Sequence, residues 1–349
     1  MPESLGDWGG GHSRMNFNTV IPKFEEIFSL ENLWRAWRAF SAGKKQKADV
    51  AEFALYLFRN LSDLQAEILA GSYRHGQYQH FRVQDQKVRE IHKAPVRDRV
   101  VHHALYQALY PYFDKKFIHD SYSCRLKKGT HRALRRFASL ARREGLNHTH
   151  TVWVLKCDVS KCFASIDHAV LKAILERHIS CQRTLQMLNL VIDSFGVGSG
   201  CGIPLGNLTS QLFVNIYLNE LDQYAKRILG TRSYLRYADD WVVFSRERAQ
   251  LENLLGIFKL FTGWALKFKI KPEWRSIRTV ASGVDWLGWV HFPDHRVLRT
   301  STKQKLLMNF KTSPAVRTSY LGLLTHGNAR KLATIVSGEP RAIIGLWNL

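Results

Sequence analysis

Two adjacent aspartates, Asp239 and Asp240, separate two short runs of aromatic and β-branched residues in the stretch "SYLRYADDWVVFS". Each run has the composition of a strand, and two residues between two strands predict a tight hairpin. A hairpin with no other role favours Asn-Gly or Asp-Gly at its tip. Neighbouring carboxylates repel each other unless a cation lies against them, and Mg²⁺ prefers such oxygen ligands. A solvated turn is the alternative, so the rest of the chain has to decide.

A third carboxylate, Asp158, ends the apolar run "VWVLKCD". The run predicts a buried strand, which tolerates an acid only where the side chain points into a cleft. If this strand lies beside the hairpin, three carboxylates meet at one edge of a sheet. Three acids can hold two Mg²⁺ ions roughly 3.5–4 Å apart, one activating a 3′-hydroxyl and one neutralising a triphosphate. Asp158 alone would read as a helix cap, but the three acids together favour catalysis.

The charge of the chain is strongly positive, with 51 Lys and Arg residues against 29 Asp and Glu and a formal net charge of +22. The basic residues gather in 82–143 and 259–349, which flank the acids in sequence. Such an excess indicates a polyanionic partner, and we favour nucleic acid over a merely solubilising surface.

The cysteines and the apolar runs indicate the cellular compartment of the protein. Five cysteines form no disulfide-like framework, which indicates a reducing, cytoplasmic setting. Cys157 and Cys162 are expected to be core thiols, because no second Cys/His pair with metal-site spacing accompanies them. No run of 18 apolar residues occurs, so no membrane span is expected. Residues 1–19 lack a signal-peptide pattern and are expected to form a flexible leader.

The elements that must position the acids mix helices with strands. Helices are expected at 20–70, 98–113 with a stop near Pro111, 129–143, 168–179, 183–195, 208–228 and 247–264, and in the last fifty or so residues. Strands are expected at 71–95, 151–158, 233–245 and 284–292, and a Gly/Pro loop at 200–207. The order is not a regular βαβ alternation, so the predicted fold class is α+β.

Three segments resemble, in order and spacing, motifs A, B and C of a reverse transcriptase palm: "DVSKCFASID", "GIPLGNLTSQLFVNIYLNELD" and "RYADDWVVF". "KVREIHKAPVRDRVVHHAL" and "FIHDSYSCRLKKGTHRAL" resemble finger motifs of bacterial reverse transcriptases, and "GVDWLGWVHFPDHRVLR" resembles the late palm hairpin and primer grip. The resemblance covers about residues 80–300. It rests on the ordered set, since the Tyr-Ala-Asp-Asp tetrad alone is a weak signal.

This resemblance implies an RNA-directed DNA polymerase with a right-hand polymerase fold of fingers, palm and thumb. The palm would be an antiparallel sheet with helices, and the thumb would be short and helical. The implied divisions are a flexible leader at 1–19, N-terminal helices and fingers at 20–150, the palm at 151–292 and a basic thumb at 293–349. The implied cofactor is Mg²⁺, as two ions, with Mn²⁺ as a substitute.

The resemblance also assigns roles to individual residues. The metal ligands would be Asp158, Val159, Asp239 and Asp240, of which the three aspartates would be catalytic. The nucleotide-binding residues would be Lys87, Arg89, Phe163, Leu205, Gly206 and Gln211. The primer and template contacts would be Arg97, Arg125, Lys127, Lys128, Trp286 and Gly288. Phe163 falls at the steric gate that excludes a 2′-hydroxyl, with a core phenylalanine as its alternative. Arg89 would grip the triphosphate, with ordinary surface charge as its alternative.

Leu205 departs from the Gln that most reverse transcriptases carry in motif B. An aliphatic residue followed by "GNLTSQ" resembles the enzymes of diversity-generating retroelements, which copy template adenines poorly. The implied partners are template RNA, a DNA or RNA primer, dNTPs and a small basic accessory protein, with no membrane. An antiviral-defence enzyme and an inactive polymerase-like RNA-binding protein are the alternatives. A group II intron enzyme is less favoured, because only about fifty residues follow the palm.

Overall fold

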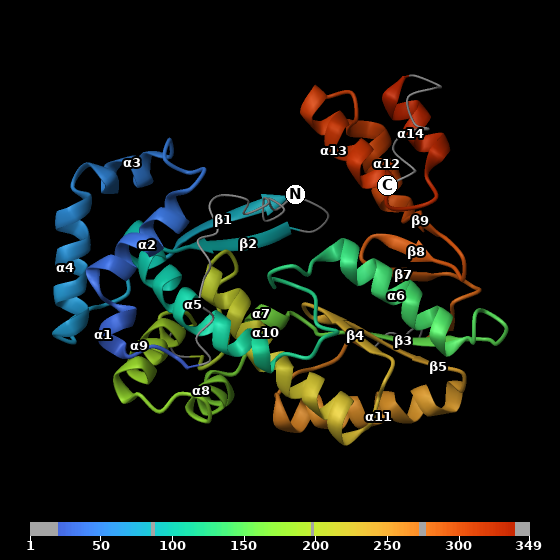
Figure 1. Ribbon diagram of the computed structural model, residues 1–349, viewed down its shortest axis with the longest axis horizontal. Helices are drawn as coiled ribbons and strands as arrows, with labels where there is room; N and C mark the ends of the chain where they lie inside the picture. Colours follow the sequence, from blue (N-terminus) through green and yellow to red (C-terminus); the bar gives the residue numbers. More distant parts are fainter. Residues whose placement is uncertain (1–19, 85–87, 197–198, 272–276, 339–349) are drawn as a thin grey trace. The chain divides into compact units, whose positions relative to one another are not determined.

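A computed structural model of the chain describes residues 20–84, 88–196, 199–271 and 277–338 (Figure 1). The chain forms two compact units. The first comprises Met1–Ile118, Val159–Tyr224 and Phe261–Lys269, and the second comprises His119–Asp158, Ala225–Leu260 and Ile270–Leu349. Helices and antiparallel sheets occur together, so the predicted α+β class is confirmed. The four divisions expected from the resemblance stay predictions.

The first unit is mostly helical. Its helices are α1 (Phe24–Ile27), α2 (Leu30–Ser41), α3 (Ala48–Leu55), α4 (Leu57–Leu69), α5 (Val96–Lys116), α7 (Cys162–Ser165), α8 (His168–Glu176), α9 (Gln182–Asp193) and α10 (Leu208–Gln223). Its strands β1 (Gln79–Gln84) and β2 (Val88–Lys93) form an antiparallel hairpin. Helix α5 contacts both α2 and α10 and is buried around most of its circumference, as expected for a core helix.

The helix expected to stop near Pro111 does not stop there. Helix α5 continues through Pro111 to Lys116. A proline inside a helix removes one hydrogen bond of the ladder, which disfavours continuation. Burial of Tyr110 and Phe113 on either side of Pro111 anchors this part of the helix in the core, and that packing offsets the lost hydrogen bond.

The second unit is built on a four-stranded antiparallel sheet of order β4-β5-β3-β6. Its strands are β3 (Trp153–Asp158), β4 (Tyr234–Tyr237), β5 (Asp240–Ser245) and β6 (Ile277–Thr279). A three-stranded sheet follows, formed by β7 (Val284–Trp286), β8 (Trp289–His291) and β9 (Arg296–Leu298). Helix α6 (Thr130–Glu144) contacts β4 and β5. Helices α12 (Thr300–Asn309), α13 (Pro314–Leu324) and α14 (Arg330–Ser337) group beyond the smaller sheet (Figure 1).

Two elements link the units along the chain. A π-helical turn, Tyr224–Ile228, continues α10, and helix α11 spans Arg248–Ala265. Within the described residues no helix is both long enough and apolar enough to cross a lipid bilayer.

Strand β5 is buried on both faces, which explains its unbroken apolar sequence. Phe244 packs against Phe137 of α6, with ring centroids 4.8 Å apart. Trp241 points to the other face and lies edge-on to Phe258 of α11, with centroids 6.3 Å apart. Phe137 also stacks on Trp286 at 5.5 Å, so one core joins α6 to both sheets of the second unit.

Candidate active site

Asp158 and Asp240 stand directly opposite each other on paired antiparallel strands. Asp158 is the last residue of β3, and Asp240, the first residue of β5, pairs with it and also with Tyr237 at the end of β4. The expectation that the Asp158 strand lies beside the hairpin is confirmed. The tip of the hairpin is shifted by one residue from the expected one, because Ala238 and Asp239 form the two-residue loop. All three acids belong to the second unit.

The hairpin turn is held by a buried arginine. Ala238 adopts a φ of +52°, in the left-handed region that disfavours residues with a side chain. Arg236 is fully buried, and its Nη1 donates to the Ala238 carbonyl at 2.8 Å while its Nη2 donates to Ser121 Oγ at 3.0 Å. The guanidinium therefore fixes the backbone immediately before Asp239 and ties it to a segment far away in sequence.

That distant segment, residues 120–122, extends the edge of the sheet. The Arg236 amide donates to the Asp120 carbonyl at 2.9 Å, and the Tyr122 amide donates to the Arg236 carbonyl at 3.0 Å. Asp120 is itself buried and binds the Arg136 guanidinium, with Nε to Oδ1 at 2.7 Å. The segment continues directly into the cations expected to contact primer or template.

Those cations are partly engaged with their own segment. Arg125 Nη1 donates to the Ser121 carbonyl at 3.0 Å, and Lys128 Nζ donates to the His119 carbonyl at 2.8 Å. Lys127 is exposed. These contacts fix the loop that carries the three cations beside β4.

Burial and mutual repulsion disfavour the ionised acids. Burial, and then the charge of Asp158, raises the pKa of Asp239. Burial raises the pKa of Asp240 to about 6; Asp158 and Asp239 add to the rise, whereas Lys156 and Lys271 oppose it. The carboxylates therefore gain from any positive charge placed against them.

Lys271 supplies such a charge. Its Nζ forms an ion pair with Asp158 Oδ2, and its backbone amide donates to the Asp158 carbonyl at 3.0 Å. Partial burial by itself disfavours the ammonium, but the hydrogen bond to Asp158 and the charges of all three acids outweigh it and raise the pKa of Lys271. The lysine therefore partly neutralises the carboxylate cluster.

The donor set fits a hard divalent cation. Asp240 Oδ1 is buried, and no described residue hydrogen-bonds to it, which is costly for a carboxylate oxygen unless a cation contacts it. Among the described residues, no group of three His, Cys, Asp or Glu side chains is already gathered closely enough to hold a metal. Lys271 occupies Oδ2 of Asp158, so a metal that uses this oxygen would have to displace the ammonium.

Four of the residues expected near the nucleotide lie in the first unit. One is on the β1–β2 hairpin, and the others are on α10 and the loop before it, which is hydrogen-bonded to that hairpin. The His92 amide at the end of the β1–β2 hairpin donates to the Leu205 carbonyl at 3.0 Å, and Asn207 Nδ2 donates to the His92 carbonyl at 3.0 Å. Gly206 has a φ of +117°, and a Cβ there would lie 2.9 Å from Ile91 Cγ2, so the close approach requires glycine. Arg89 is exposed on the same hairpin and Gln211 lies on α10, whereas Lys87 lies outside the described residues.

Phe163 and Val159 also lie in the first unit. Phe163 is half-buried on α7, and its carbonyl accepts from the Ile203 amide at 2.8 Å, next to the loop that carries Leu205. Val159 directly follows β3 and is fully buried, so only its backbone is suited to a ligand role.

Two further residues expected to contact primer or template also have their side chains engaged within the protein. Arg97 forms an ion pair with Glu67, and its guanidinium lies 5.3 Å from the centre of the Tyr73 ring. Trp286 is fully buried against Phe137, so contact with a primer would fall to the backbone turn that ends at Gly288. Gly288 has a φ of +84°.

Sequence reasoning missed Arg236 and Lys271. Arg236 gave one signal, because it is a charged residue inside an otherwise apolar strand. Lys271 gave none, since it lies in a polar segment far from the acids in sequence.

Three comparisons relate the chain to known proteins. Residues 82–291 match the family described as "Reverse transcriptase (RNA-dependent DNA polymerase)". Protein YkfC of Escherichia coli K12 is 26% identical over 266 residues, which cover 65% of this chain and 68% of YkfC. An uncharacterized 91 kDa protein in the cob intron of Schizosaccharomyces pombe is 26% identical over 144 residues, covering 40% of this chain and 17% of that protein. A structure of apo telomerase from Candida tropicalis, truncated from its C-terminal domain, has a TM-score of 0.47 at 10% identity and covers 69% of this chain and 60% of that one.

Asp240→Asn is expected to stabilise the metal-free protein at neutral pH. The pKa of Asp240 rises from 3.8 to about 6 on folding, so the folded chain binds this proton more tightly than the unfolded chain does. The free energy of unfolding then falls as pH rises from about 4 to about 6 and stays lower above that range. Thermal unfolding in EDTA should show the variant roughly 1–3 kcal/mol more stable at pH 7.5, with the gain vanishing near pH 4.

The matched control is Asp63→Asn, the same change at an exposed acid, which should alter stability by less than about 0.5 kcal/mol. Equal stability of Asp240→Asn and the parent protein at pH 7.5 would show that burying the ionised Asp240 carboxylate carries no cost.

Arg236→Lys and Arg236→Gln are expected to lower kcat for nucleotide incorporation about 10- to 100-fold. Neither side chain can hold the Ala238 carbonyl and Ser121 Oγ as the guanidinium fork does, so Asp239 loses its fixed direction. Ser233→Ala is the control, because it removes a 2.7 Å hydrogen bond to Glu144 at the opposite end of β4. It should lower thermal stability and leave kcat unchanged. A folded Arg236→Gln protein with normal kcat would remove the arginine from this role.

Proposed function

We propose, since this chain belongs to the reverse transcriptase family, that it copies a template RNA into cDNA by two-metal nucleotidyl transfer at Asp158, Asp239 and Asp240. Family membership carries RNA-directed DNA polymerase activity, with a nucleic-acid template and dNTPs as substrates. The observation that supports the assigned residues best is the pairing of Asp158 with Asp240 across two strands, with Asp239 on the adjoining turn. The right-hand division into fingers, palm and thumb belongs to the same proposal.

Enzymes of this family use divalent metal ions, here proposed to be two Mg²⁺ ions with Mn²⁺ as a substitute. Asp158 and Asp239 would hold them, with Asp240 and the Val159 carbonyl beside them. When bound, such ions activate the 3′-hydroxyl and stabilise charge on the leaving pyrophosphate. The buried Asp240 Oδ1, which no described residue contacts, supports a cation at this position.

Residues of the chain compensate charge, hold the turn before Asp239 and bind the substrate. Lys271 keeps Asp158 compensated until the substrates arrive, and opening of their ion pair frees both oxygens of the carboxylate. Arg236 keeps the turn before Asp239 fixed, so little reorganisation accompanies the reaction. Arg89 and Lys87 would grip the triphosphate, and the Phe163 ring would exclude a ribose 2′-hydroxyl.

We assign the chain to a diversity-generating retroelement because of Leu205. Leucine cannot hydrogen-bond around the incoming nucleotide, so selection rests more on shape and pairing, and the resemblance to retroelement enzymes implies that template adenines are copied poorly. The tie between the Leu205 carbonyl and the His92 amide supports a fixed backbone here, which leaves the side chain as the variable element. A small basic accessory protein is part of this proposal. An antiviral role would keep the same chemistry, and accurate copying by the unmodified enzyme would favour it.

Asp239→Asn should abolish Mg²⁺-dependent dNTP incorporation, with a loss of about 10³-fold or more, equivalent to about 4 kcal/mol of transition-state stabilisation. RNA affinity should stay within about twofold, because basic residues outside the acid cluster supply the binding. Primer extension and RNA binding are measured on the same preparation. Extension near the parent rate would refute the metal-ligand assignment.

Leu205→Gln should lower misincorporation about tenfold, chiefly opposite template adenines, because an amide restores a hydrogen bond that favours the correct nucleotide by about 1.4 kcal/mol. Leu205→Met, which has a similar length and no hydrogen-bonding group, is the matched control and should keep the parent error spectrum. One RNA is copied by all three proteins and the products are sequenced. Equal error spectra for Leu205→Gln and Leu205→Met would show that Leu205 does not cause the misincorporation.

A further inference from the structure

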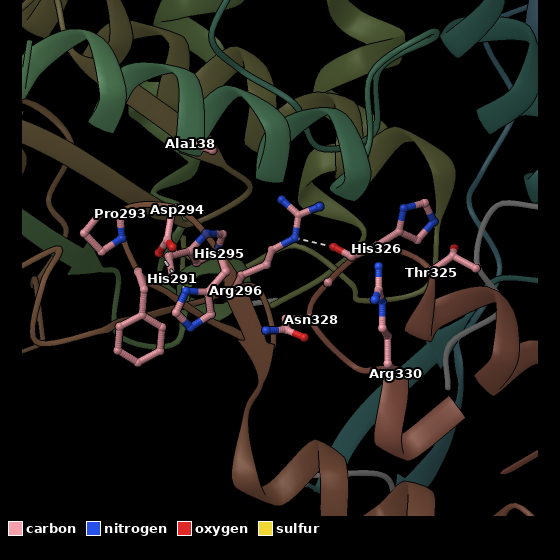
Figure 2. A pocket seen from close by; sticks show the side chains of 12 residues that line it. Ala138, His291, Pro293, Asp294, His295, Arg296, Thr325, His326, Asn328 and Arg330 are labelled. Atoms are coloured by element: carbon pink, nitrogen blue, oxygen red, sulfur yellow. Dashed lines mark hydrogen bonds and ion pairs between the residues drawn. The ribbon is translucent and has the colours of Figure 1, made fainter. Parts of the chain in front are cut away.

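A hollow of about 670 Å³ lies within the second unit, away from the acid cluster in sequence (Figure 2). Ala138 of α6 forms one wall. The turn between β8 and β9, from His291 to Arg296, forms a second, and residues from Thr325 to Arg330, between α13 and the start of α14, form the third. None of the residues given an individual catalytic or binding role lines this hollow, although its second wall belongs to the segment that resembles the late palm hairpin and primer grip.

Arg296 is held rigidly at the wall of the hollow. Its Nε donates to the His326 carbonyl, drawn as the dashed line in Figure 2, and its guanidinium lies 5.7 Å from the centre of the Trp289 ring. Its own carbonyl accepts from the Asn328 amide at 2.8 Å. Because Nε is used, the two Nη groups are left for a ligand, and no described carboxylate lies within ion-pair distance of them.

The loop that holds Arg296 has little freedom to move. A Cβ at Gly327 would lie 2.0 Å from Trp289 Cζ3, so the backbone of this loop lies against the indole face. The next residue, Asn328, is hydrogen-bonded through its amide to the Arg296 carbonyl. The guanidinium is therefore pre-organised rather than placed on a free surface side chain.

Positive charge near Arg296 comes from other arginines. Arg330 lines the hollow, and burial, followed by the charge of Arg135, lowers the pKa of Arg296. His131 of α6 stacks on His326 with centroids 3.6 Å apart. Burial and the charges of His131, Arg296 and Arg135 lower the pKa of His326 to about 4, so this ring is neutral at pH 7. Asp294 is the acid among the lining residues, and it is exposed and hydrogen-bonded to His295 Nδ1 at 2.8 Å. An anion in the hollow would relieve the repulsion between the arginines.

We propose that this hollow binds a phosphate of a nucleic-acid backbone, a second contact that rests on the proposed function but lies outside the polymerisation site. Guanidinium forks match phosphate oxygens in geometry and charge. Single-stranded bases are usually bound on exposed aromatic platforms, and none of the lining residues is an exposed large hydrophobic side chain. The contact is therefore with the backbone and independent of sequence.

The hollow is also distinct from the turn expected to contact the primer. That turn, at Gly288, joins β7 to β8, whereas His291 and Arg296 lie at the other end of β8. Three strand residues separate the two ends, which corresponds to about 10 Å at roughly 3.3 Å per residue. A backbone phosphate in the hollow thus belongs to a part of the nucleic acid away from the growing 3′ end.

The test uses a base-paired RNA hairpin with a blocked 3′ end, so that binding is measured without extension. Ala138 is exposed on α6 and lines the hollow, so a charged residue can be placed at this position without disturbing a core contact. By fluorescence anisotropy, Ala138→Glu should weaken binding about fivefold to tenfold and Ala138→Lys should tighten it about threefold. Arg296→Gln should weaken binding about tenfold and make the log–log salt slope less negative by roughly 0.9.

Arg248→Gln is the matched control, because it removes one positive charge from an exposed α11 residue, which is ion-paired to Glu252. It should bind the hairpin within twofold of the parent protein. If Arg296→Gln does not fold, the two Ala138 variants decide the question, since neither touches the core.

Three outcomes would overturn the proposal in separable ways. Ala138→Glu and Ala138→Lys that bind like Arg248→Gln would remove the hollow as a nucleic-acid contact. If the variants changed the affinity for inorganic tripolyphosphate but not the affinity for RNA, the hollow would be a pocket for small polyanions instead. A parent protein with no measurable RNA affinity would contradict the proposed function itself, whereas unchanged variants on an RNA-binding parent contradict only this inference.

Discussion

Repulsion among three carboxylates at the ends of two paired strands is the constraint that organises the second unit. Asp158 and Asp240 face each other across β3 and β5, and Asp239 follows a turn in left-handed conformation. The chain answers this cost with a buried guanidinium at the turn and an ammonium against Asp158. Lys271 is separated from Asp158 by 113 positions in sequence, so the cluster depends on the tertiary fold for part of its charge balance.

The apolar residues around the acids serve the same end. Strand β5 is covered on one face by Phe137 of α6 and on the other by Phe258 of α11, which shields it from water up to Asp240. Water is thereby kept from one oxygen of that carboxylate, which leaves a buried acceptor for a cation. Burial and charge therefore act together: the packing that makes the carboxylates unfavourable alone would make them strong ligands for the proposed metal ions.

Much of this could be predicted from sequence, and the rest could not, for physical reasons. Apolar runs that end in Asp158 and surround Asp239 and Asp240 predicted the strands and their proximity, because strands with such composition are buried side by side. The register could not be predicted, and the loop proved to be Ala238–Asp239. Helix α5 passes Pro111 because core packing overrides local propensity. Arg236 bonds Ser121, Lys271 bonds Asp158 and Arg296 bonds His326 only through contacts between segments far apart in sequence, which no local pattern encodes.

The sequence separation between the residues that hold the turn before Asp239 bears on when this turn forms. Arg236 and Ser121, whose side chains meet beside the turn that precedes Asp239, are separated by 115 positions in sequence. Closing so long a loop costs conformational entropy before any contact repays it, and contacts of high sequence separation slow folding. The turn before Asp239 therefore reaches its final shape late, after the local helices have formed. During synthesis, a chain that has emerged only as far as β5 contains all three acids and most of its basic residues but lacks Lys271, so Asp158 is made well before the ammonium that compensates its charge.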